Sequence, residues 1–464
     1  MLCSPNKEAL QFLMDVSDVF AEIEENGIPT DLRYIIRKAR AMRQEKKDLQ
    51  NDFDNSDIGV KWRETYKENL NYNSTQQLGK VLFEELDFTP KVFTPTGKPA
   101  TSKDTLLELG DENLKKFFKA KEIDKAIGTY LLNYKKETVK GVLHPNFNLN
   151  TVKTYRTSSS APNFQNVPKH DPYIKTLVRD AFRAPKDHYF VEIDYGSMEV
   201  RCAACYHKDP RMVRYIETGY DPHREMAAKC YLCELEQVSK DMRQAAKNRF
   251  VFPTFYGSWW RDTGENMWEG ISELKLALKD GTPLEKHLNE QGILNLGKIK
   301  QVGGKYTIEG ENTFFHHIKA VEDWVWDEMF PVYAQWRRDW VKEYKRKGYF
   351  TGFTGFNYQG VMKRTDVINY AVQGVGAHCL LWSLMRMQEH IKRNQMVSKL
   401  VGQIHDSIVA LVHKDELERF KRMARRVMTI DIRKEWEWII VPLEIEMEIS
   451  KLGGTWAEME EVEI

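Results

Sequence analysis

The sequence predicts an α+β fold with several subdomains. Residues 6–142 show mainly helical periodicity, and residues 198–347 form a second helical block. Residues 188–195 and 400–412 are short apolar runs of the kind found in buried strands. Strands that are separated by a long helical block and return near the end of the chain are typical of an α+β assembly.

The N-terminal part is predicted to be helical. An amphipathic helix is expected over 9–25, a turn with Gly and Pro over 26–31, and a basic helix over 32–49. A further helix is expected over 73–86. The segment 89–103 is rich in Pro, Thr and Gly, so we expect an exposed loop there, followed by more helix.

The rest of the chain is predicted to return to β structure. Residues 157–163 are polar and irregular, and the stretch 274–310 is rich in Lys, Glu and Gly, which is the character of an insertion. The expected strands are 188–195, 348–358, 400–412 and 439–449, and the expected late helices are 366–392 and 415–432.

The amino-acid composition excludes few classes of protein function. The chain has 464 residues, with 69 Lys and Arg against 68 Asp and Glu, for a net charge of +1. Any phosphate-binding surface must therefore come from the distribution of charge. The N-terminus lacks a basic segment followed by an apolar core, and no apolar run approaches membrane-spanning length. A cytoplasmic protein without membrane contact is expected.

Two C-x-x-C pairs, Cys202 with Cys205 and Cys230 with Cys233, have the spacing of a four-thiolate zinc site. Both pairs lie in helix-like stretches that contain alanine and lack the glycine of a zinc knuckle. Small buried cysteines in a reducing compartment are the preferred interpretation, and the zinc site is the less favoured alternative.

Two aspartates stand beside apolar β-type residues. Asp194 lies within Val191–Arg201, and Asp406 lies within Gln403–Val409. A carboxylate next to a buried strand costs free energy unless something pairs with it, so we expect the two strands to meet and share metal ions. Two carboxylates that hold a pair of hard cations are what in-line phosphoryl transfer requires.

A basic helical face lies between these aspartates. Arg243 and Lys247 are four residues apart, so they share one face of a helix. Two neighbouring cations repel unless an anion lies between them, and a triphosphate is such an anion. If these two charges were the only observation, a helix face exposed to solvent would be the favoured interpretation. Nearby aromatics would offer a base a stacking surface. These aromatics are Phe250, Phe252, Phe255 and Tyr256.

At these residues the sequence resembles the polymerase region of family A DNA polymerases, the group of bacterial repair polymerase I and several phage replicases. Asp194-Tyr-Gly-Ser-Met-Glu-Val-Arg201 is similar to the first carboxylate motif of the family. Arg243-x-x-x-Lys247 with Tyr256-Gly257 is similar to its fingers-helix motif, and His405-Asp406 to its second carboxylate motif, on a β-hairpin.

Further segments are similar to family motifs and follow in the family's order, from about residue 9 to the C-terminus. They are the serine-rich DNA-contacting segment Arg156–Pro168, the histidine element Asp221-Pro-His223, the minor-groove helix Asn369–Gly374, and the thumb segments 73–76 and 96–102.

The resemblance implies a right-hand polymerase fold of phage type, with an antiparallel palm sheet, helical fingers and a helical thumb. The expected ranges are an N-terminal helix on the palm over 1–30, a thumb over 31–145, palm parts over 146–205 and 348–464, and fingers over 206–347 with an insertion at about 262–313.

The implied activity is template-directed DNA synthesis in replication or repair. Deoxynucleotides (dNTPs) would be added to a primer 3′-hydroxyl by two-metal phosphoryl transfer, with release of pyrophosphate. Asp194, Asp406 and the Tyr195 carbonyl would hold two Mg²⁺ ions. Glu199 would exclude a 2′-hydroxyl by its bulk. The residues that would grip the incoming phosphates are Arg243, Lys247 and His223, with Lys247 also catalytic.

The same resemblance implies contacts with a primer-template duplex, mostly through minor-groove acceptors that are nearly independent of sequence. The implied residues are Arg156, Asn163, Asn166, Asn369, Gln373, Gln403 and His405, with Lys98 and Ser102 on the backbone. Taken alone, the asparagines and Gln373 could be ordinary helix and turn residues, and His405 could brace the hairpin.

The sequence departs from the family pattern in three places. Tyr256 lies one residue farther from Lys247 than is usual, and Pro253 would remove a helical hydrogen bond between them. A bulge or break is expected, which leaves open which of the four aromatics stacks on the nucleotide. Ser407 stands where an acidic residue is usual, and the helical block after Gly257 is longer than usual.

Family members commonly carry a 3′–5′ exonuclease domain before the thumb, whereas thumb-like helices begin almost at Met1 here. We therefore expect no proofreading within this chain, with the exonuclease either cut away or encoded separately. A separate exonuclease, a helicase and a processivity factor are candidate partners. One rival function is a single-chain RNA polymerase, which Glu199 opposes. Another is an inactive DNA-binding protein, which the intact carboxylates and cations oppose.

Overall fold

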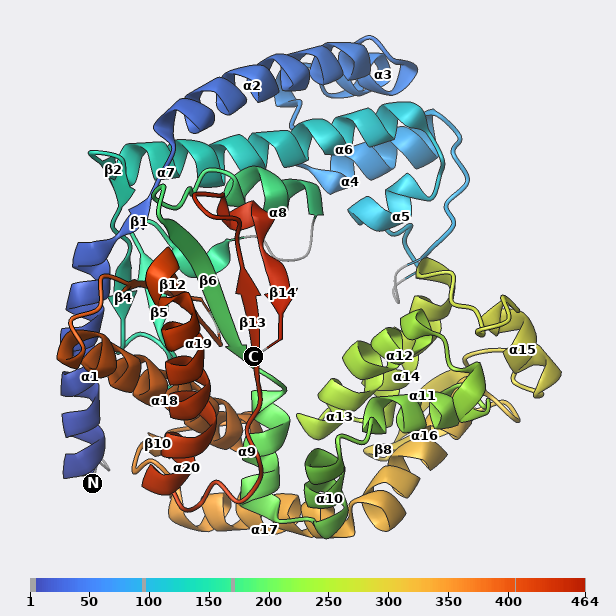
Figure 1. The fold of residues 1–464 in the computed structure, drawn as a ribbon. Helices are drawn as coiled ribbons and strands as arrows, with labels where there is room; N and C mark the ends of the chain where they lie inside the picture. The colour runs from blue at the N-terminus through green and yellow to red at the C-terminus, as the bar shows by residue number, and fades with distance from the viewer. Residues whose placement is uncertain (1–5, 94–96, 168–171, 405, 464) are drawn as a thin grey trace.

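The computed structural model describes residues 6–93, 97–167, 172–404 and 406–463. A central antiparallel sheet is flanked by one helical lobe above it and a second to its side (Figure 1). The sheet has the strand order β11-β12-β6-β13-β14. Its strands are β6 (His188–Tyr195), β11 (Lys399–Ile404), β12 (Ser407–His413), β13 (Ile445–Ile449) and β14 (Glu460–Val462). The predicted α+β class is confirmed.

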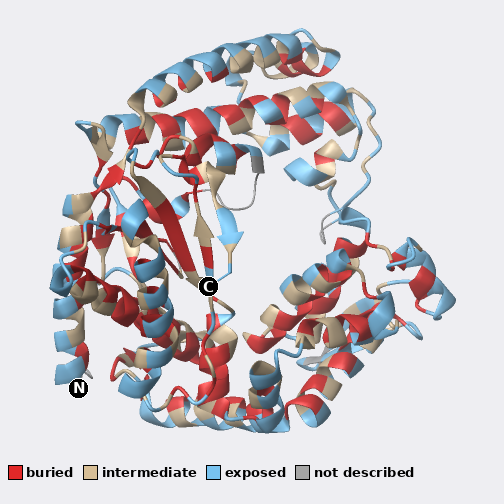
Figure 2. Ribbon diagram, in the orientation of Figure 1, coloured by how far each residue is buried: buried red, intermediate tan, exposed pale blue. Residues whose placement is uncertain are grey.

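The middle strand of the sheet is β6, which is covered on both faces (Figure 2). Side chains alternate between the two faces of a strand, so its residues enter two different cores. Val191 and Ile193 belong to a core that includes residues of α9 (Met198–His207) and α18 (Arg364–Arg393). Phe190 belongs to the other core, with Trp456 and α8 (Pro172–Arg179).

Helices and short strands around the central sheet support it. The N-terminal helix α1 (Lys7–Asn26) packs on β11 and α18, and the Asn26 side chain donates a hydrogen bond to the Leu400 carbonyl at 3.0 Å. The 30-residue α18 is one of the expected helices. The remaining elements near the sheet are α17 (Pro331–Lys347), α19 (Leu417–Arg426), α20 (Ile432–Glu435), β1 (Ile28–Pro29), β2 (Thr138–Val139), β3 (Val142–Leu143), β9 (Tyr349–Thr351) and β10 (Asn357–Gln359).

The upper lobe has its own aromatic core. Phe53, Trp62 and Phe117 lie in mutual ring contact, with centroid distances from 4.6 to 6.3 Å. Ion pairs such as Lys116–Asp52 also join its two long helices. Its helices are α2 (Leu32–Asp54), α3 (Asp57–Tyr66), α4 (Thr75–Lys80), α5 (Lys103–Leu107), α6 (Glu112–Lys125) and α7 (Leu132–Glu137).

The lateral lobe is mostly helical and includes the predicted insertion. A π-helical turn over Lys247–Val251 joins α12 to α13, and Pro253, which cannot donate a backbone hydrogen bond, follows that turn within the continuous helical run Lys240–Phe255. The expected bulge near Pro253 is therefore present. The elements are α10 (Pro210–Thr218), α11 (Pro222–Cys230), α12 (Lys240–Ala246), α13 (Phe252–Phe255), α14 (Trp260–Glu273), α15 (Leu284–Glu290), β7 (Lys298–Val302), β8 (Lys305–Glu309) and α16 (Phe314–Trp324).

Three secondary-structure expectations were wrong in part. The serine-rich segment is not wholly irregular, because β5 (Ser158–Ser160) pairs with β4 (Asn146–Asn148). Helix ends at Glu137 rather than continuing to about residue 142, since the chain turns into the β2–β3 hairpin. The last expected strand is shorter than 439–449, because only Ile445–Ile449 pairs with β6.

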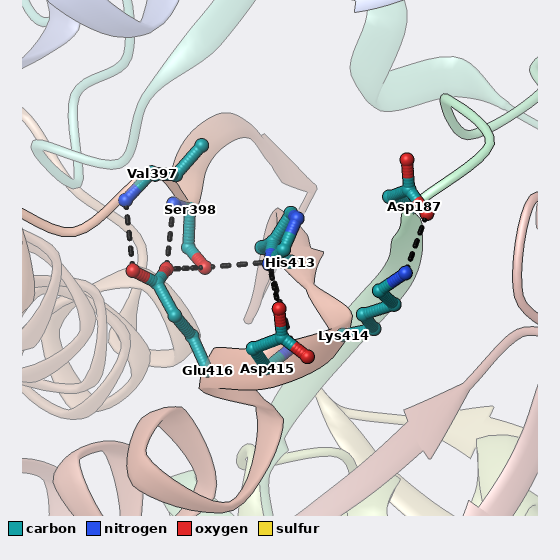
Figure 3. A network of polar contacts seen from close by, with 7 residues as sticks. All are labelled: Asp187, Val397, Ser398, His413, Lys414, Asp415 and Glu416. Atoms are coloured by element: carbon teal, nitrogen blue, oxygen red, sulfur yellow. Dashed lines mark hydrogen bonds and ion pairs between the residues drawn. The ribbon is translucent and has the colours of Figure 1, made fainter.

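A network of polar contacts stabilises the C-terminal end of β12 (Figure 3). Glu416 accepts hydrogen bonds from the backbone N–H groups of Val397 and Ser398, at 2.9 and 2.8 Å. The Lys414 ammonium pairs with Asp187 at 2.8 Å, immediately before β6 begins. These contacts tie β11, β12 and β6 together at one end, and thereby help to hold their register.

Cys202, Cys205 and Cys230 lie in helices and in the core, and Cys233 lies in the loop after α11. Cys202, Cys205 and Cys230 are buried free thiols, and Cys233 is partly buried. Burial raises the pKa of both Cys205 and Cys233 to about 11, so these thiols stay protonated. Among the described residues no three His, Cys, Asp or Glu side chains are grouped as a metal set, and no helix has the length and apolar character needed to cross a bilayer.

Buried histidines make the fold sensitive to acid. His378 is fully buried, its Nδ1 lies 2.6 Å from the Thr354 hydroxyl, and burial lowers its pKa to about 3. Because its folded pKa lies below the unfolded value, the unfolded chain binds the extra proton, and stability is lost as pH falls below about 6.5. We predict that the free energy of unfolding drops by roughly 2 kcal/mol from this residue between pH 7 and 5.

Urea unfolding at both pH values measures this loss. His378→Phe keeps the ring contact with Phe356 and should reduce the pH dependence by about that amount. The partly exposed His390 of the same helix supplies the matched control, His390→Phe. An unchanged pH dependence in His378→Phe would contradict the prediction.

Candidate active site

The register of the sheet brings the two predicted aspartates together. Asp194 of β6 lies directly opposite Ser407 of β12, and Ser407 pairs with Ile404 across a two-residue turn. Asp406 occupies that turn, one residue from the partner of Asp194. Opposed residues in antiparallel strands have Cα atoms about 4.5–5.5 Å apart, so both carboxylates lie at the same end of the sheet.

Arg156 and Glu199 lie at the same end of the sheet as these aspartates. The Arg156 guanidinium contacts the Glu199 carboxylate at 2.6 Å and lies 3.9 Å from the Asp406 carboxylate. Glu199 is in the first turn of α9, which starts directly after β6. Burial raises the pKa of Glu199, and the charge of Asp406 adds to the shift, while Arg156 opposes it.

A cavity of about 300 Å³ opens beside these groups. The Gln403 side-chain oxygen accepts hydrogen bonds from the Thr157 hydroxyl at 2.5 Å and from Gln165 at 2.7 Å, which fixes one wall. Sequence reasoning missed Thr157 and Gln165, although both stand in the serine-rich segment. The lining residues are Arg156, Thr157, Gln165, Glu199, Ala377, Leu381, Gln403 and Asp406.

The predicted phosphate-binding cations lie on the lateral lobe. Arg243 is ion-paired with Asp221, whose carboxylate also accepts from the His223 backbone N–H at 3.2 Å. Burial and the charge of Arg243 lower the pKa of Lys247. Burial and the charge of Lys247 lower the pKa of His223 to about 4, and the buried Nδ1 of His223 has no hydrogen-bond partner among the described residues. This cluster would be stabilised by an anion.

The structure narrows the choice among the four aromatics. Phe250 is fully buried in the core. Phe255 is 5 % exposed and contacts Phe330 and Tyr333, but it also lines the small cavity that Phe252 and Tyr256 share. Burial thus sets Phe250 apart from the other three, and the ring that stacks on a nucleotide stays a prediction. Phe252 and Tyr256 are only partly buried and stack on each other at 6.2 Å.

Phe252 is also part of the cation cluster. Its ring lies 5.2 Å from the Lys247 ammonium and 5.7 Å from the His223 ring. Tyr256, Phe252 and Glu199 line one small cavity with Asn369 of α18. The Asn369 side-chain oxygen is buried without a hydrogen-bond partner among the described residues, and Gln373 is partly buried one turn later.

The other predicted residues do not line these two cavities or lie outside the described residues. Asn163 and Asn166 are exposed on either side of the buried Gln165. Ser102 caps α5 of the upper lobe, and Lys98 is exposed in the loop before it, so neither joins the catalytic strands. His405 lies outside the described residues. The Tyr195 hydroxyl is buried against Ser383 at 2.8 Å, which leaves only its backbone for a ligand.

A further carboxylate was missed. Glu446 of β13 lies directly opposite Asp194, on the side away from Ser407, and its charge acts on Lys247. Alternating glutamates in Glu444-Ile-Glu-Met-Glu448 were the available signal, but the pairing of β13 with β6 is a long-range property.

Hard oxygen donors fit a divalent cation at this end of the sheet. Asp194 and Asp406 supply two carboxylates, and Mg²⁺ is typically bound by one or two carboxylates together with substrate phosphates rather than by an all-protein cage. The donor set therefore suits Mg²⁺, with the phosphates supplied by a ligand on the lateral lobe.

The family model described as DNA polymerase family A matches residues 39–272 and 295–458. DNA polymerase I of Aquifex aeolicus is 27% identical over 438 residues, which is 93% of this chain and 65% of that protein. The DNA polymerase of Bacillus phage SP01 is 25% identical over 413 residues, 83% of this chain and 40% of that protein. The chain thus spans less than two thirds of these relatives.

A solved structure has the same fold. It is the POL domain of Pol1 from M. smegmatis in complex with DNA primer-template and dNTP, with a TM-score of 0.71 at 20% identity. The match covers 96% of this chain and 70% of that one. Residues 273–294 of this chain, which the family model does not match, fall within the expected insertion.

We predict that His223 titrates with a pKa of about 4 and that inorganic triphosphate raises this value. A bound polyanion offsets the charges of Lys247 and Arg243, which favours the imidazolium form. NMR of isotopically labelled histidine measures the pKa, with His223→Gln for assignment. Chloride at equal ionic strength is the control for screening. A pKa near 6.5 that does not respond to triphosphate would contradict the site.

Proposed function

Because this chain belongs to DNA polymerase family A, we propose that it is a template-directed DNA polymerase. It adds dNTPs to a primer 3′-hydroxyl by two-metal phosphoryl transfer and releases pyrophosphate, in DNA replication or repair. The observation that carries the proposal is the register of β6 and β12, which places Asp194 beside the turn that contains Asp406.

The fold is the right-hand polymerase fold, and we assign its parts as follows. The upper lobe together with β2 and β3, 31–145, is the thumb, and the lateral lobe together with α17, 206–347, is the fingers. The sheet with its helices, 146–205 and 348–464, is the palm, against which residues 1–30 pack. The insertion at about 262–313 extends the fingers. This arrangement places the carboxylates on the palm and the phosphate-binding cations on the fingers.

Members of this family are metal-dependent, and we assign the metal site to Asp194, Asp406 and the Tyr195 carbonyl. When bound, two Mg²⁺ ions lower the pKa of the primer hydroxyl and neutralise charge on the triphosphate and its leaving pyrophosphate. Asp194 and Asp406 would hold these ions at one end of the sheet.

The fingers residues grip the triphosphate. Arg243 exchanges its ion pair with Asp221 for phosphate oxygens, and Lys247 and the buried His223 contact the same anion. Phe252 or Tyr256 stacks on the base, because their rings lie beside the cations and line one cavity with Glu199. Closure of the fingers brings Lys247 towards the aspartates.

Primer-template DNA is the proposed partner of the palm and thumb. Arg156 and Gln403 line the cavity beside Asp406, and Asn369 lines the neighbouring cavity. The side-chain N–H groups of these residues can donate to minor-groove acceptors, which differ little between base pairs. The other proposed DNA contacts are Asn163, Asn166, Gln373, His405, Lys98 and Ser102.

Primer extension with Mg²⁺ and each nucleotide type tests the proposal. A DNA polymerase extends the primer with dNTPs and much less with ribonucleotides, an RNA polymerase shows the opposite preference, and a DNA-binding protein extends nothing. Failure of the pure protein to extend a primer with dNTPs would refute the proposed activity.

Asp194→Asn and Asp406→Asn are each predicted to reduce extension by about 10³-fold or more while duplex binding persists. Metal-assisted charge stabilisation contributes several kcal/mol to the transition state. Asp187→Asn at the opposite end of β6 is the matched control, since its exposed ion pair with Lys414 is worth little. Full activity in either catalytic variant would remove the metal assignment.

Glu199→Ala is predicted to raise ribonucleotide incorporation relative to dNTP incorporation by about tenfold or more. The half-buried carboxylate, held by Arg156, occupies the space for a 2′-hydroxyl, and rejection of one small group is worth about 1–3 kcal/mol. The ratio of kcat/KM for the paired nucleotides measures the change. An unaltered ratio in an active variant would rule out this role.

A further inference from the structure

A second carboxylate lies on the same strand and the same face as Asp194. Glu192 precedes Asp194 by two residues in β6, and alternate residues of a strand share one face. Its side chain is 7 % exposed, whereas acidic side chains are almost never buried unless they are paired. The proposed chemistry gives Glu192 no role.

Both oxygens of Glu192 are engaged. Oε2 accepts hydrogen bonds from the Arg179 guanidinium at 3.1 Å and from the Trp456 indole at 3.0 Å. Oε1 accepts a hydrogen bond from the Ser407 hydroxyl at 2.9 Å. Arg179 is 2 % exposed and stacks on Trp456 at 4.3 Å, so the ion pair is enclosed between the sheet and the helices behind it.

The bond to Ser407 reaches the catalytic turn. Ser407 is the first residue of β12, pairs with Ile404 across the two-residue turn and lies opposite Asp194. Its hydroxyl is 2.9 Å from both the Glu192 carboxylate and the Ile404 carbonyl, and a hydroxyl has one proton to donate. A charge-assisted bond to the carboxylate is the stronger of the two.

The two residues form a matched pair. An acidic side chain at position 407, which is usual in the family, would place its carboxylate against Glu192 in a buried layer. Like charges at that distance cannot both ionise without a large cost. With serine at 407, the network contains one carboxylate and one buried guanidinium, and no charge is left without a partner.

We propose that Glu192 is a positioning residue that acts through Ser407 to hold the Asp406 turn against Asp194. An acidic residue at position 407 would place a buried negative charge on β12. In this chain Glu192 provides that negative charge from β6 instead. This inference rests on the proposed function, because its consequence is the relative position of the two metal-binding carboxylates.

A charge-swap series tests the pairing. The variants are S407A, S407E, E192S and the double variant E192S/S407E. The readouts are Mn²⁺ binding by calorimetry without nucleotide, the half-saturating Mg²⁺ concentration for extension, and kcat and KM for the dNTP. Mn²⁺ binding does not require turnover, so it reports on the network even if the protein proves inactive.

S407A is expected to weaken Mn²⁺ binding and lower kcat by about 10- to 100-fold, with the dNTP KM little changed, as is typical when a group that orients a metal ligand is lost. S407E should show a similar or greater loss, and E192S/S407E should recover most of it. Phe190→Leu controls for stability, since Phe190 shares the strand and face but lies far from the turn. It should lower stability and leave Mn²⁺ binding unchanged.

The proposal is overturned if S407A binds Mn²⁺ and turns over like the unmodified protein. It is equally overturned if a folded E192S/S407E variant is no better than S407E. Should the Glu192 variants fail to fold, S407A alone decides, because it removes one hydroxyl and leaves the buried ion pair intact. Loss of extension in the unmodified protein with normal Mn²⁺ binding would instead count against the proposed function.

Discussion

The register between β6 and β12 is the constraint on which the rest of the structure depends. Asp194 lies opposite Ser407, and a slip of one residue would turn Asp194 into the apolar core and Ile193 into the site. The register is held at one end by the Glu416 network (Figure 3) and by the backbone bond from the Lys414 N–H to the Asp187 carbonyl at 2.9 Å, and at the other by the bond between Ser407 and Glu192. The pairing is covered on both faces, so solvent does not compete with it.

Charge is divided between two parts of the molecule that a ligand would join. The carboxylates are at the end of the sheet, whose strands β6 and β12 are mostly buried, and the cations are on the lateral lobe. There, Lys247 and His223 have lowered pKa values because they are buried beside other positive charge. Under the proposed function, a nucleotide triphosphate with its metal ions would satisfy both parts at once. This separation explains how a chain with a net charge of +1 can offer a phosphate site.

Local patterns predicted most elements, but not their pairing. The strand 188–195 and the helix after it follow from apolar runs and periodicity, and the two aspartates could be proposed from desolvation cost alone. The Glu192–Ser407 bond joins residues 215 apart in the chain, so no local pattern could reveal it. Ser158–Ser160 was missed because serine has no strand preference and its partner strand supplies the order. The sequence does not show that Phe250 and Phe255 are buried whereas Phe252 and Tyr256 are partly exposed, because burial depends on the three-dimensional fold.

Anomalous diffraction from a complex with primer-template, a non-hydrolysable dNTP and Mn²⁺ would locate the metal ions. We expect two Mn²⁺ peaks roughly 3.5–4 Å apart, both in contact with Asp194 and Asp406, with the triphosphate extending to Arg243 and Lys247. A bound nucleotide whose metal ions lie away from these two carboxylates would contradict this expectation.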